Sequence, residues 1–236
     1  MRIAVLQPSY LPWLGYLDQI ARSDAFIFYD DVQFDKNGWR NRNRIRNRSS
    51  EGCGWLTVPV RLSSHFPKII EVEIDTRVPW QRKHLATLAS EYARAPFHER
   101  LIDFTDFFKR PYHSLADAAI DSVRALMKGF KIATPLYRSS QLGIEGDRNT
   151  RLLNLCKHFG ATHYLSGVAA RTYLDVPLFK NNGITVEWQS YEHPTYPQRY
   201  EPFISHLSAI DALLNVGPAA SRLIDDATLT STGRKA

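Results

Sequence analysis

The chain has 236 residues, a length that fits one large domain or one domain with a small insert. Hydrophobic residues make up 44% of it, as in an ordinary globular core, and no apolar run is long enough for a membrane span. The net charge of +6 has a local source, because six cations and no acid lie between Lys36 and Arg48. The composition excludes a membrane-spanning protein. It predicts a site for a phosphate, a carboxylate or a nucleic-acid backbone, the plainer alternative being a solvated charged face.

The cysteines and the N-terminus indicate a cellular compartment. Cys53 and Cys156 stand in unrelated contexts and form no C-x-x-C pair. The first residues contain one arginine and a short apolar run followed by polar residues and prolines, which is typical of a first strand and not of a signal peptide. Both observations predict a reduced, cytoplasmic protein.

The first 29 residues predict a compact βαβ unit. The pattern favours strands at residues 2–7 and 24–29 and a helix at 13–21, with a loop that Pro8 and Pro12 keep out of helical conformation. In such units ligands bind at the carboxyl ends of the strands. We therefore predict a crevice lined by Gln7, Ser9 and Tyr10 after the first strand and by Asp30, Asp31 and Gln33 after the second.

The basic run follows directly. Arginines stand at every second position from Arg40 to Arg48, and Asn41, Asn43, Ile45 and Asn47 alternate with them. In a strand these arginines would share one face, whereas in a helix they would spread around the axis. Residues 36–75 are therefore predicted to form a β-ribbon insert with a face of guanidinium groups, suited to bidentate contacts with phosphate or carboxylate. Two further strands are expected at residues 55–60 and 68–74.

The rest of the chain alternates between helical and strand patterns. Residues 78–128 predict a helical segment, with helices at 80–92, 95–108 and 115–127. Residues 131–217 predict the second half of the α/β core, and residues 218–236 a polar tail that frays from residue 228. The chain is thus predicted to form a single α/β domain: a Rossmann-like parallel sheet with flanking helices, a basic β-ribbon and a helical insert. The remaining core elements are expected at 131–137, 151–159, 162–165, 177–181, 183–190 and 203–215.

Familiar catalytic motifs are missing. The sequence has no metal-ligand spacing, no phosphate-binding glycine loop, no G-x-G-x-x-G and no complete G-x-S-x-G around Ser166. The candidate proton-transfer groups are Asp30, Asp31, His84 and His193, although single histidines are more often structural or exposed. The first turn has the position of the H-x-G-H motif of nucleotidyltransferases, but Trp13 and Tyr16 replace both histidines around Gly15.

Several long blocks resemble the WbqC-like proteins, a family found in bacterial polysaccharide gene clusters. The resemblance implies a role in O-antigen assembly, and some members of the family are suggested to transfer glycine onto the amino group of a nucleotide-linked amino sugar. The matching blocks are residues 7–24, 30–45, 55–60, 80–84, 160–167, 173–175, 183–198 and 207–217.

Together the residues and the resemblance suggest an acyl or aminoacyl transferase acting on a nucleotide-activated amino sugar. In this hypothesis Arg40, Arg42 and Arg44 hold a diphosphate, aromatic rings stack on the base or sugar, and a carboxylate accepts a proton from the amine. The candidate catalytic residues are Asp30, Asp31 and His84. The candidate substrate-binding residues are Gln7, Tyr10, Trp13, Gly15, Gln33, Lys36, Trp39, Arg40, Arg42, Asn43, Arg44, Ser166, Tyr191, His193, Tyr196 and Gln198.

The sequence leaves the cofactor, the acyl donor and the oligomeric state open. The donor could be a free amino acid activated with ATP, a thioester or a charged transfer RNA, and the expected partner is a sugar nucleotide or another anionic small molecule. The alternatives are a nucleic-acid-binding protein that uses the Arg/Asn ribbon, a nucleotidyltransferase-like adenylate-forming enzyme, and an inactive scaffold.

Overall fold

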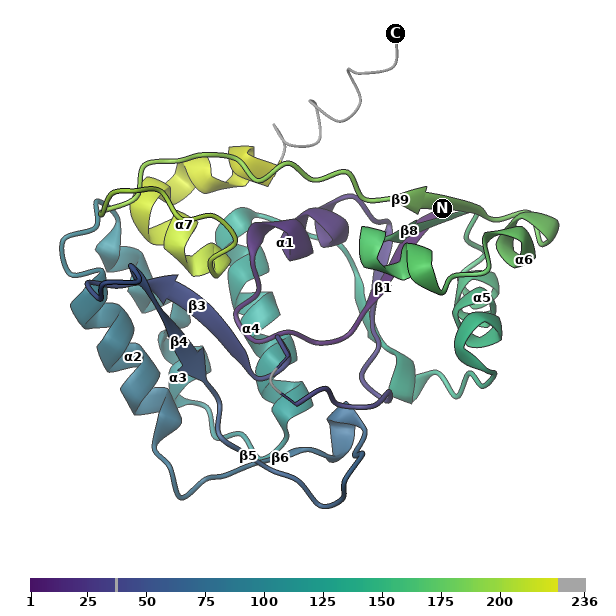
Figure 1. Ribbon diagram of the computed structural model, residues 1–236, viewed down its shortest axis with the longest axis horizontal. Helices are drawn as coiled ribbons and strands as arrows, with labels where there is room; N and C mark the ends of the chain where they lie inside the picture. Colours follow the sequence, from purple (N-terminus) through teal and green to yellow (C-terminus); the bar gives the residue numbers. More distant parts are fainter. Residues whose placement is uncertain (37, 225–236) are drawn as a thin grey trace, which may run out of the picture.

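A five-stranded parallel sheet lies at the centre of the computed structural model, which describes residues 1–36 and 38–224 (Figure 1). The order of its strands is β7-β2-β1-β8-β9. From β1 the chain winds outward through β2 and β7, and it then returns to the other side of β1 for β8 and β9. This doubly wound order confirms the predicted Rossmann-like fold. The strands are β1 (Arg2–Leu6), β2 (Ala25–Phe28), β7 (Leu136–Arg138), β8 (His163–Ser166) and β9 (Thr185–Trp188).

Helices cover both faces of this sheet. Ala4 of β1 belongs to the hydrophobic cluster that contains α1, α4 and α7, whereas Ile3 and Val5 belong to the cluster that contains α5 and α6. A strand buried on both faces needs apolar residues at every position, which explains the continuous run in β1. The helices are α1 (Leu14–Ala21), α4 (Leu115–Phe130), α5 (Arg148–His158), α6 (Val176–Asn181) and α7 (Ala209–Val216).

The ribbon and the helical insert lie between β2 and β7 in the chain and fill the left of Figure 1. Strand β3 (Arg42–Arg46) pairs antiparallel with β4 (Cys53–Thr57), so the predicted ribbon is present. The strand predicted at 68–74 is wrong in its middle, where Ile69–Glu71 forms a 3-10 helix. The remaining elements of this region are β5 (Val60–Arg61), β6 (Glu73–Ile74), α2 (Trp80–Glu91), a 3-10 helix (His98–Phe104) and α3 (Thr105–Lys109).

The C-terminal part differs from the sequence prediction in where its helix begins. Helix α7 begins at Ala209 and not near residue 203, because the Ser208 hydroxyl accepts a hydrogen bond from the Ile210 amide and caps the helix there. The segment predicted as a tail starts inside a 3-10 helix (Gly217–Ser221), and Ile224 is buried in the core. The rest of the predicted tail, with its expected fraying, lies outside the described residues. Two further short 3-10 helices are Ser139–Gln141 and Val168–Thr172.

The loop between β1 and α1 is strained and is held from two sides. Leu11 is fully buried with a φ of 42°, in the left-handed region that is costly for a residue with a branched side chain. Its amide donates to the hydroxyl of Ser122 on α4 at 2.9 Å. Its carbonyl accepts from the Asn43 Nδ2 on β3 at 2.8 Å. These two hydrogen bonds join the ribbon and α4 to the loop that leads into α1.

We expect Asn43→Ala to lower the free energy of unfolding by about 1–3 kcal/mol, because the buried Leu11 carbonyl would lose its partner. Urea denaturation of the variant and the wild type measures the change. Asn182→Ala removes an exposed amide that bonds only to the Leu178 carbonyl within its own helix, so it should change stability by less than about 0.5 kcal/mol. Equal stability of the two variants would show that Asn43 does not hold the loop.

Candidate functional site

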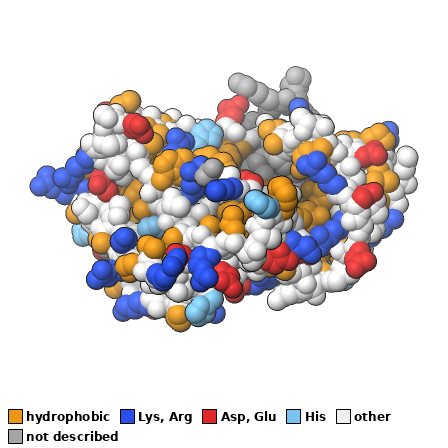
Figure 2. All heavy atoms as spheres, turned by 60° about the horizontal axis from the view of Figure 1, so that its bottom comes forward, with side chains coloured by type: hydrophobic (Ala, Val, Ile, Leu, Met, Phe, Trp, Pro, Cys, Tyr) orange, Lys and Arg blue, Asp and Glu red, His pale blue; other side chains and the backbone are white. Residues whose placement is uncertain are grey.

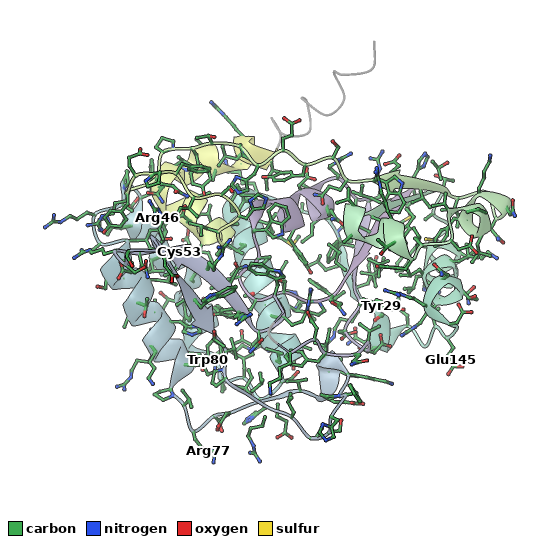
Figure 3. The ribbon with its side chains drawn as sticks, viewed as in Figure 1. Tyr29, Arg46, Cys53, Arg77, Trp80 and Glu145 are labelled. Carbon is green, nitrogen blue, oxygen red and sulfur yellow. The ribbon has the colours of Figure 1, made fainter. Side chains whose placement is uncertain are left out.

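Polar side chains gather where the parallel strands end. A pocket of about 290 Å³ lies at the carboxyl ends of β2 and β7, and we call it the Asp31 pocket. In Figure 3, Tyr29 and Glu145 mark this side of the molecule, below β1 and α5. The ring of Tyr29 lies 5.0 Å from the guanidinium of Arg151. The pocket is lined by Asp31, Lys68, Ser139, Ser140, Gly143, Ile144, Glu145, Gly146 and Arg151.

The two adjacent carboxylates at the end of β2 have different environments. Asp30 is fully buried, and its oxygens accept from the Arg138 Nε at 2.6 Å, the Ser140 amide at 3.0 Å and the Ser140 hydroxyl at 2.9 Å. These contacts fasten β2 to the segment after β7. The Asp31 carboxylate instead lines the pocket, where it pairs with Arg151 and accepts from the Ser139 hydroxyl. Of the two carboxylates predicted as candidate bases, Asp31 is therefore the one that faces a cavity.

The exposed part of the ribbon combines arginines with tryptophans. The guanidinium of Arg42 lies 4.3 Å from the ring of Trp55, and that of Arg44 lies 5.9 Å from both Trp39 and Trp55. The two indoles are 5.4 Å apart, and they are 42% and 47% exposed. Cation–π contacts hold the guanidinium groups in place while leaving both ring systems open to solvent. We call Trp39, Arg42, Arg44 and Trp55 the tryptophan–arginine face.

One hydrogen bond connects this face to the sheet. The Ser9 hydroxyl, just after β1, donates to the Trp39 carbonyl at 2.8 Å. Further contacts lead from the loop after β1 to the Asp31 pocket. Gln7 donates to the Gln33 carbonyl at 3.5 Å, and Gln33 forms an isolated β-bridge with Lys68, which lines the pocket. Figure 2, which brings the lower side of Figure 1 forward, shows lysine and arginine side chains among hydrophobic ones across this side.

The prediction of one continuous guanidinium face is wrong at Arg46. Its side chain is almost fully buried and donates to the carbonyls of Tyr200 at 2.6 Å and Pro202 at 2.7 Å. Arg40 pairs with Asp35 at 3.0 Å. Arg48 donates to the Tyr200 hydroxyl at 3.0 Å. Arg42 and Arg44 thus remain the arginines of the run that contribute to the tryptophan–arginine face.

Several predicted site residues lie in the interior and bond to protein groups. Tyr10 is fully buried, and its hydroxyl lies 2.8 Å from the Nδ1 of His84, far along the chain on α2. Tyr196 and Gln198 both donate to the buried Asp211 carboxylate, at 2.8 and 2.9 Å. The side chain of Asn43 likewise bonds to a buried protein group, the Leu11 carbonyl. Ser166 is also buried, at the end of β8.

Trp13 is the centre of a second aromatic cluster. Its indole lies 5.4 Å from Tyr191, 6.3 Å from His193 and 4.9 Å from His206. A Cβ at Gly15 would come within 2.2 Å of the Trp13 ring, so only glycine lets the indole lie over the start of α1. His206 adopts a left-handed backbone conformation with a φ of 59°. Two strained residues, Leu11 and His206, therefore flank Trp13.

Sequence reasoning missed several residues of these clusters. Lys68, Ser139, Ser140 and Arg151 come from segments far from Asp31 in the chain. Ser139 and Ser140 form a polar pair just after the strand predicted at 131–137, whereas no local motif marks Lys68, Arg151 or His206. Trp55 could have been found, because it opens the strand expected to pair with the arginine ribbon. Lys36 is exposed and lines a second pocket of about 350 Å³. That pocket also contains Phe34, Asn41, Arg42, Thr57, Val58, Pro59, Val60 and Leu62.

Among residues 1–36 and 38–224, no group of three or more histidine, cysteine, aspartate or glutamate side chains could hold a metal ion. Within the same residues, no helix has the length and apolar character that crossing a membrane requires.

The fold and the site define a class: a doubly wound α/β protein with a polar pocket and a cationic aromatic face at the carboxyl edge of its sheet. The family model of the WbqC-like proteins matches residues 7–223, and the chain belongs to this family. The chain is 34% identical over 222 residues to the protein named "Uncharacterized protein Rv1507c" of Mycobacterium tuberculosis, covering 93% of this chain and 95% of that protein. No solved structure matches the chain. The family predicted from the sequence blocks is confirmed.

His84 makes stability depend on pH. Burial lowers its pKa from 6.5 to about 4, and a backbone hydrogen bond at Thr57 opposes the shift. Because the folded pKa lies below the unfolded one, the neutral imidazole stabilises the fold above about pH 6.5, and this contribution is lost as the pH falls toward 4. We expect a loss of up to about 3 kcal/mol from this residue. Urea denaturation across this range should show a shallower pH dependence for His84→Gln than for the wild type.

The exposed His113 offers the matched control, because His113→Gln should keep the wild-type pH dependence. A His84→Gln variant with the same slope as the wild type would show that His84 titrates normally in the folded protein.

Proposed function

We propose that this protein is a transferase that forms an amide on the amino group of a nucleotide-linked amino sugar, with an acyl or aminoacyl group as the transferred moiety. The observation that carries the proposal is the tryptophan–arginine face, which Ser9 ties to the end of β1. Membership of the WbqC-like family agrees with a role in bacterial surface polysaccharide biosynthesis.

The nucleotide part of the substrate would bind on the tryptophan–arginine face. Trp39 and Trp55 expose indole surface on which a nucleobase can stack. The guanidinium groups of Arg42 and Arg44 lie against the same rings and offer paired donors to a diphosphate. Stacking and charge thus meet on one surface, as recognition of a nucleoside diphosphate requires.

The amino sugar would extend toward the Asp31 pocket. In the transfer step the amine nitrogen forms a bond to the acyl carbon, the bond from that carbon to the donor's leaving group breaks, and the leaving group takes its electron pair. The amine must lose a proton, and the Asp31 carboxylate is the acceptor that we assign. The pairing with Arg151 and Ser139 would keep this carboxylate oriented before the substrate arrives.

The acyl donor is one of three chemical classes: a free amino acid activated with ATP, a thioester, or an aminoacyl transfer RNA. A second candidate function rests on the same surface, because exposed tryptophans beside arginines also suit single-stranded nucleic acid. Strong binding to RNA or DNA that falls steeply with added salt, together with no binding of sugar nucleotides, would favour that function.

The first test is binding. Thermal-shift screening against sugar nucleotides selects a ligand, and calorimetry then measures its affinity for the wild type and for Trp39→Ala and Trp55→Ala. We expect each variant to bind about 5- to 150-fold more weakly, because a stacked base contributes roughly 1–3 kcal/mol. Tyr173→Ala is the matched control, since Tyr173 is also an exposed ring under an arginine, Arg148, at 3.4 Å. Unchanged affinity in both tryptophan variants would remove the face from the binding site.

The second test is turnover. Asp31→Asn should lower the rate of amide formation by about 10²–10⁴ while the affinity for the sugar nucleotide changes little, because the variant loses the proton acceptor. Mass spectrometry of the acylated sugar nucleotide measures the rate with each donor class in turn. Asp106→Asn changes an exposed carboxylate on α3 and should keep the wild-type rate. An Asp31→Asn variant that keeps both the wild-type melting temperature and the wild-type rate would reject the role of Asp31.

A further inference from the structure

Two imidazoles lie beside Trp13, and the charge of Arg44 acts on one of them, His206. The rings of His193 and His206 are 4.9 Å apart. The ring of His206 lies over the Trp13 indole at 4.9 Å, and that of His193 is nearly parallel to the same indole, with planes 8° apart. The backbone amide of Ser208 donates to the Arg44 carbonyl at 2.8 Å, which brings the segment that carries His206 against β3.

Two polar atoms in this group are buried without a hydrogen-bond partner. The Nδ1 of His193 lies 2.9 Å from the Pro194 carbonyl, and since a carbonyl only accepts, this nitrogen carries the hydrogen. The other ring nitrogen of His193, Nε2, has no partner, and neither does the Nε of Arg44. Buried polar atoms are rarely left unpaired, so each of these two atoms lacks an expected partner, and His206 lies between the two side chains as a neighbour of both.

The charges of the group indicate the sign of that partner. Burial first, and then the neighbouring Arg44, lower the pKa of His206. Burial lowers the pKa of His193 to about 4, and the proximity of His206 adds to this effect. Positive charge in one member of the group therefore disfavours positive charge in the others, and an anion among them would reverse this repulsion.

The other charged and titratable groups near His193 and His206 come from the loop at residues 191–196, from α1 and from α7. Tyr191 and Tyr196 are phenols whose pKa burial raises, so both are neutral. The Asp18 carboxylate on α1 raises the pKa of Tyr191 further, and the Asp211 carboxylate on α7 accepts a hydrogen bond from Tyr196. Glu192 stands between Tyr191 and His193 in the chain.

We propose that Arg44, His193 and His206 form a phosphate site that takes up protons when the anion binds. Protonated His193 and His206 and the Arg44 Nε would then donate to phosphate oxygens, and His206, the exposed member, would meet the ligand first. The inference rests on the proposed function, because it assigns the site to the diphosphate of the sugar nucleotide, with the base on Trp39 and Trp55.

Anion binding and proton uptake should be linked, and the sign of this linkage follows from the pKa values of the two imidazoles. In the free protein both imidazoles have pKa values below 6.5 and are neutral at neutral pH. In the complex the anion raises both values, so binding takes up protons, and the affinity rises as the pH falls from about 8 to about 6. Each fully coupled protonation strengthens binding by up to about tenfold per pH unit.

Calorimetric titration with inorganic pyrophosphate and with UDP, at about pH 6 and about pH 8, tests the site. Repeating each titration in two buffers of different ionisation enthalpy measures the protons taken up. The wild type should take up protons at about pH 7 and bind at least about fivefold more tightly at the lower pH. His206→Gln and His193→Gln should each reduce the uptake, while His113→Gln, which changes an exposed histidine outside the cluster, should keep it.

The outcomes separate this inference from the proposed function. Binding of both ligands without proton uptake, or uptake that both glutamine variants retain, would overturn the role of the imidazoles. No binding of either ligand at either pH would overturn the phosphate site itself. Proton-linked binding in a protein that acylates no sugar nucleotide would keep the phosphate site and reject the transferase.

Discussion

The hydrogen bond between the Asn43 side-chain amide and the Leu11 carbonyl is the contact on which the geometry of both the tryptophan–arginine face and the Trp13 cluster depends. It holds a strained loop in place, and that loop carries Ser9 on one side and Trp13 on the other. Ser9 fixes the tryptophan–arginine face, and Trp13 supports the two imidazoles. A local left-handed residue costs of order 1–3 kcal/mol and persists only where its surroundings enforce it. Here the enforcing groups are a ribbon residue and a residue of α4.

Two neighbouring carboxylates at the end of β2 have different surroundings. Asp30 and Asp31 are adjacent, yet one is surrounded by donors from Arg138 and Ser140, and the other opens onto a pocket. A buried carboxylate is tolerable only when charged and neutral donors satisfy it, and the donors around Asp30 come from the protein itself. Asp31 keeps part of its surface in the cavity, and its partners orient it without enclosing it.

Much of the fold follows from local patterns in the sequence. The apolar run of β1 and the periodicity of α1 are properties of neighbouring residues, and the carboxyl ends of such strands identify the side of the sheet where ligands bind. The pattern does not predict which arginines of the run are buried and which are exposed. Arg46 is buried because the carbonyls of Tyr200 and Pro202 are there to accept from it. His206 and Arg151 reach the site from distant segments, and no local rule predicts contacts of that kind.

The burial of Arg46 also has a consequence for the order in which parts of the chain fold. Its guanidinium belongs to the ribbon, but two of its acceptors lie 154 and 156 residues further along the chain. While the ribbon leaves the ribosome these two acceptors have not yet been synthesised, and a guanidinium that bonds only to the Gly52 carbonyl of its own hairpin stays in water. The hairpin can therefore pair its strands early, yet it acquires its final packing only after most of the protein exists. Contacts of such long separation are slow to close, so the ribbon is completed late in folding.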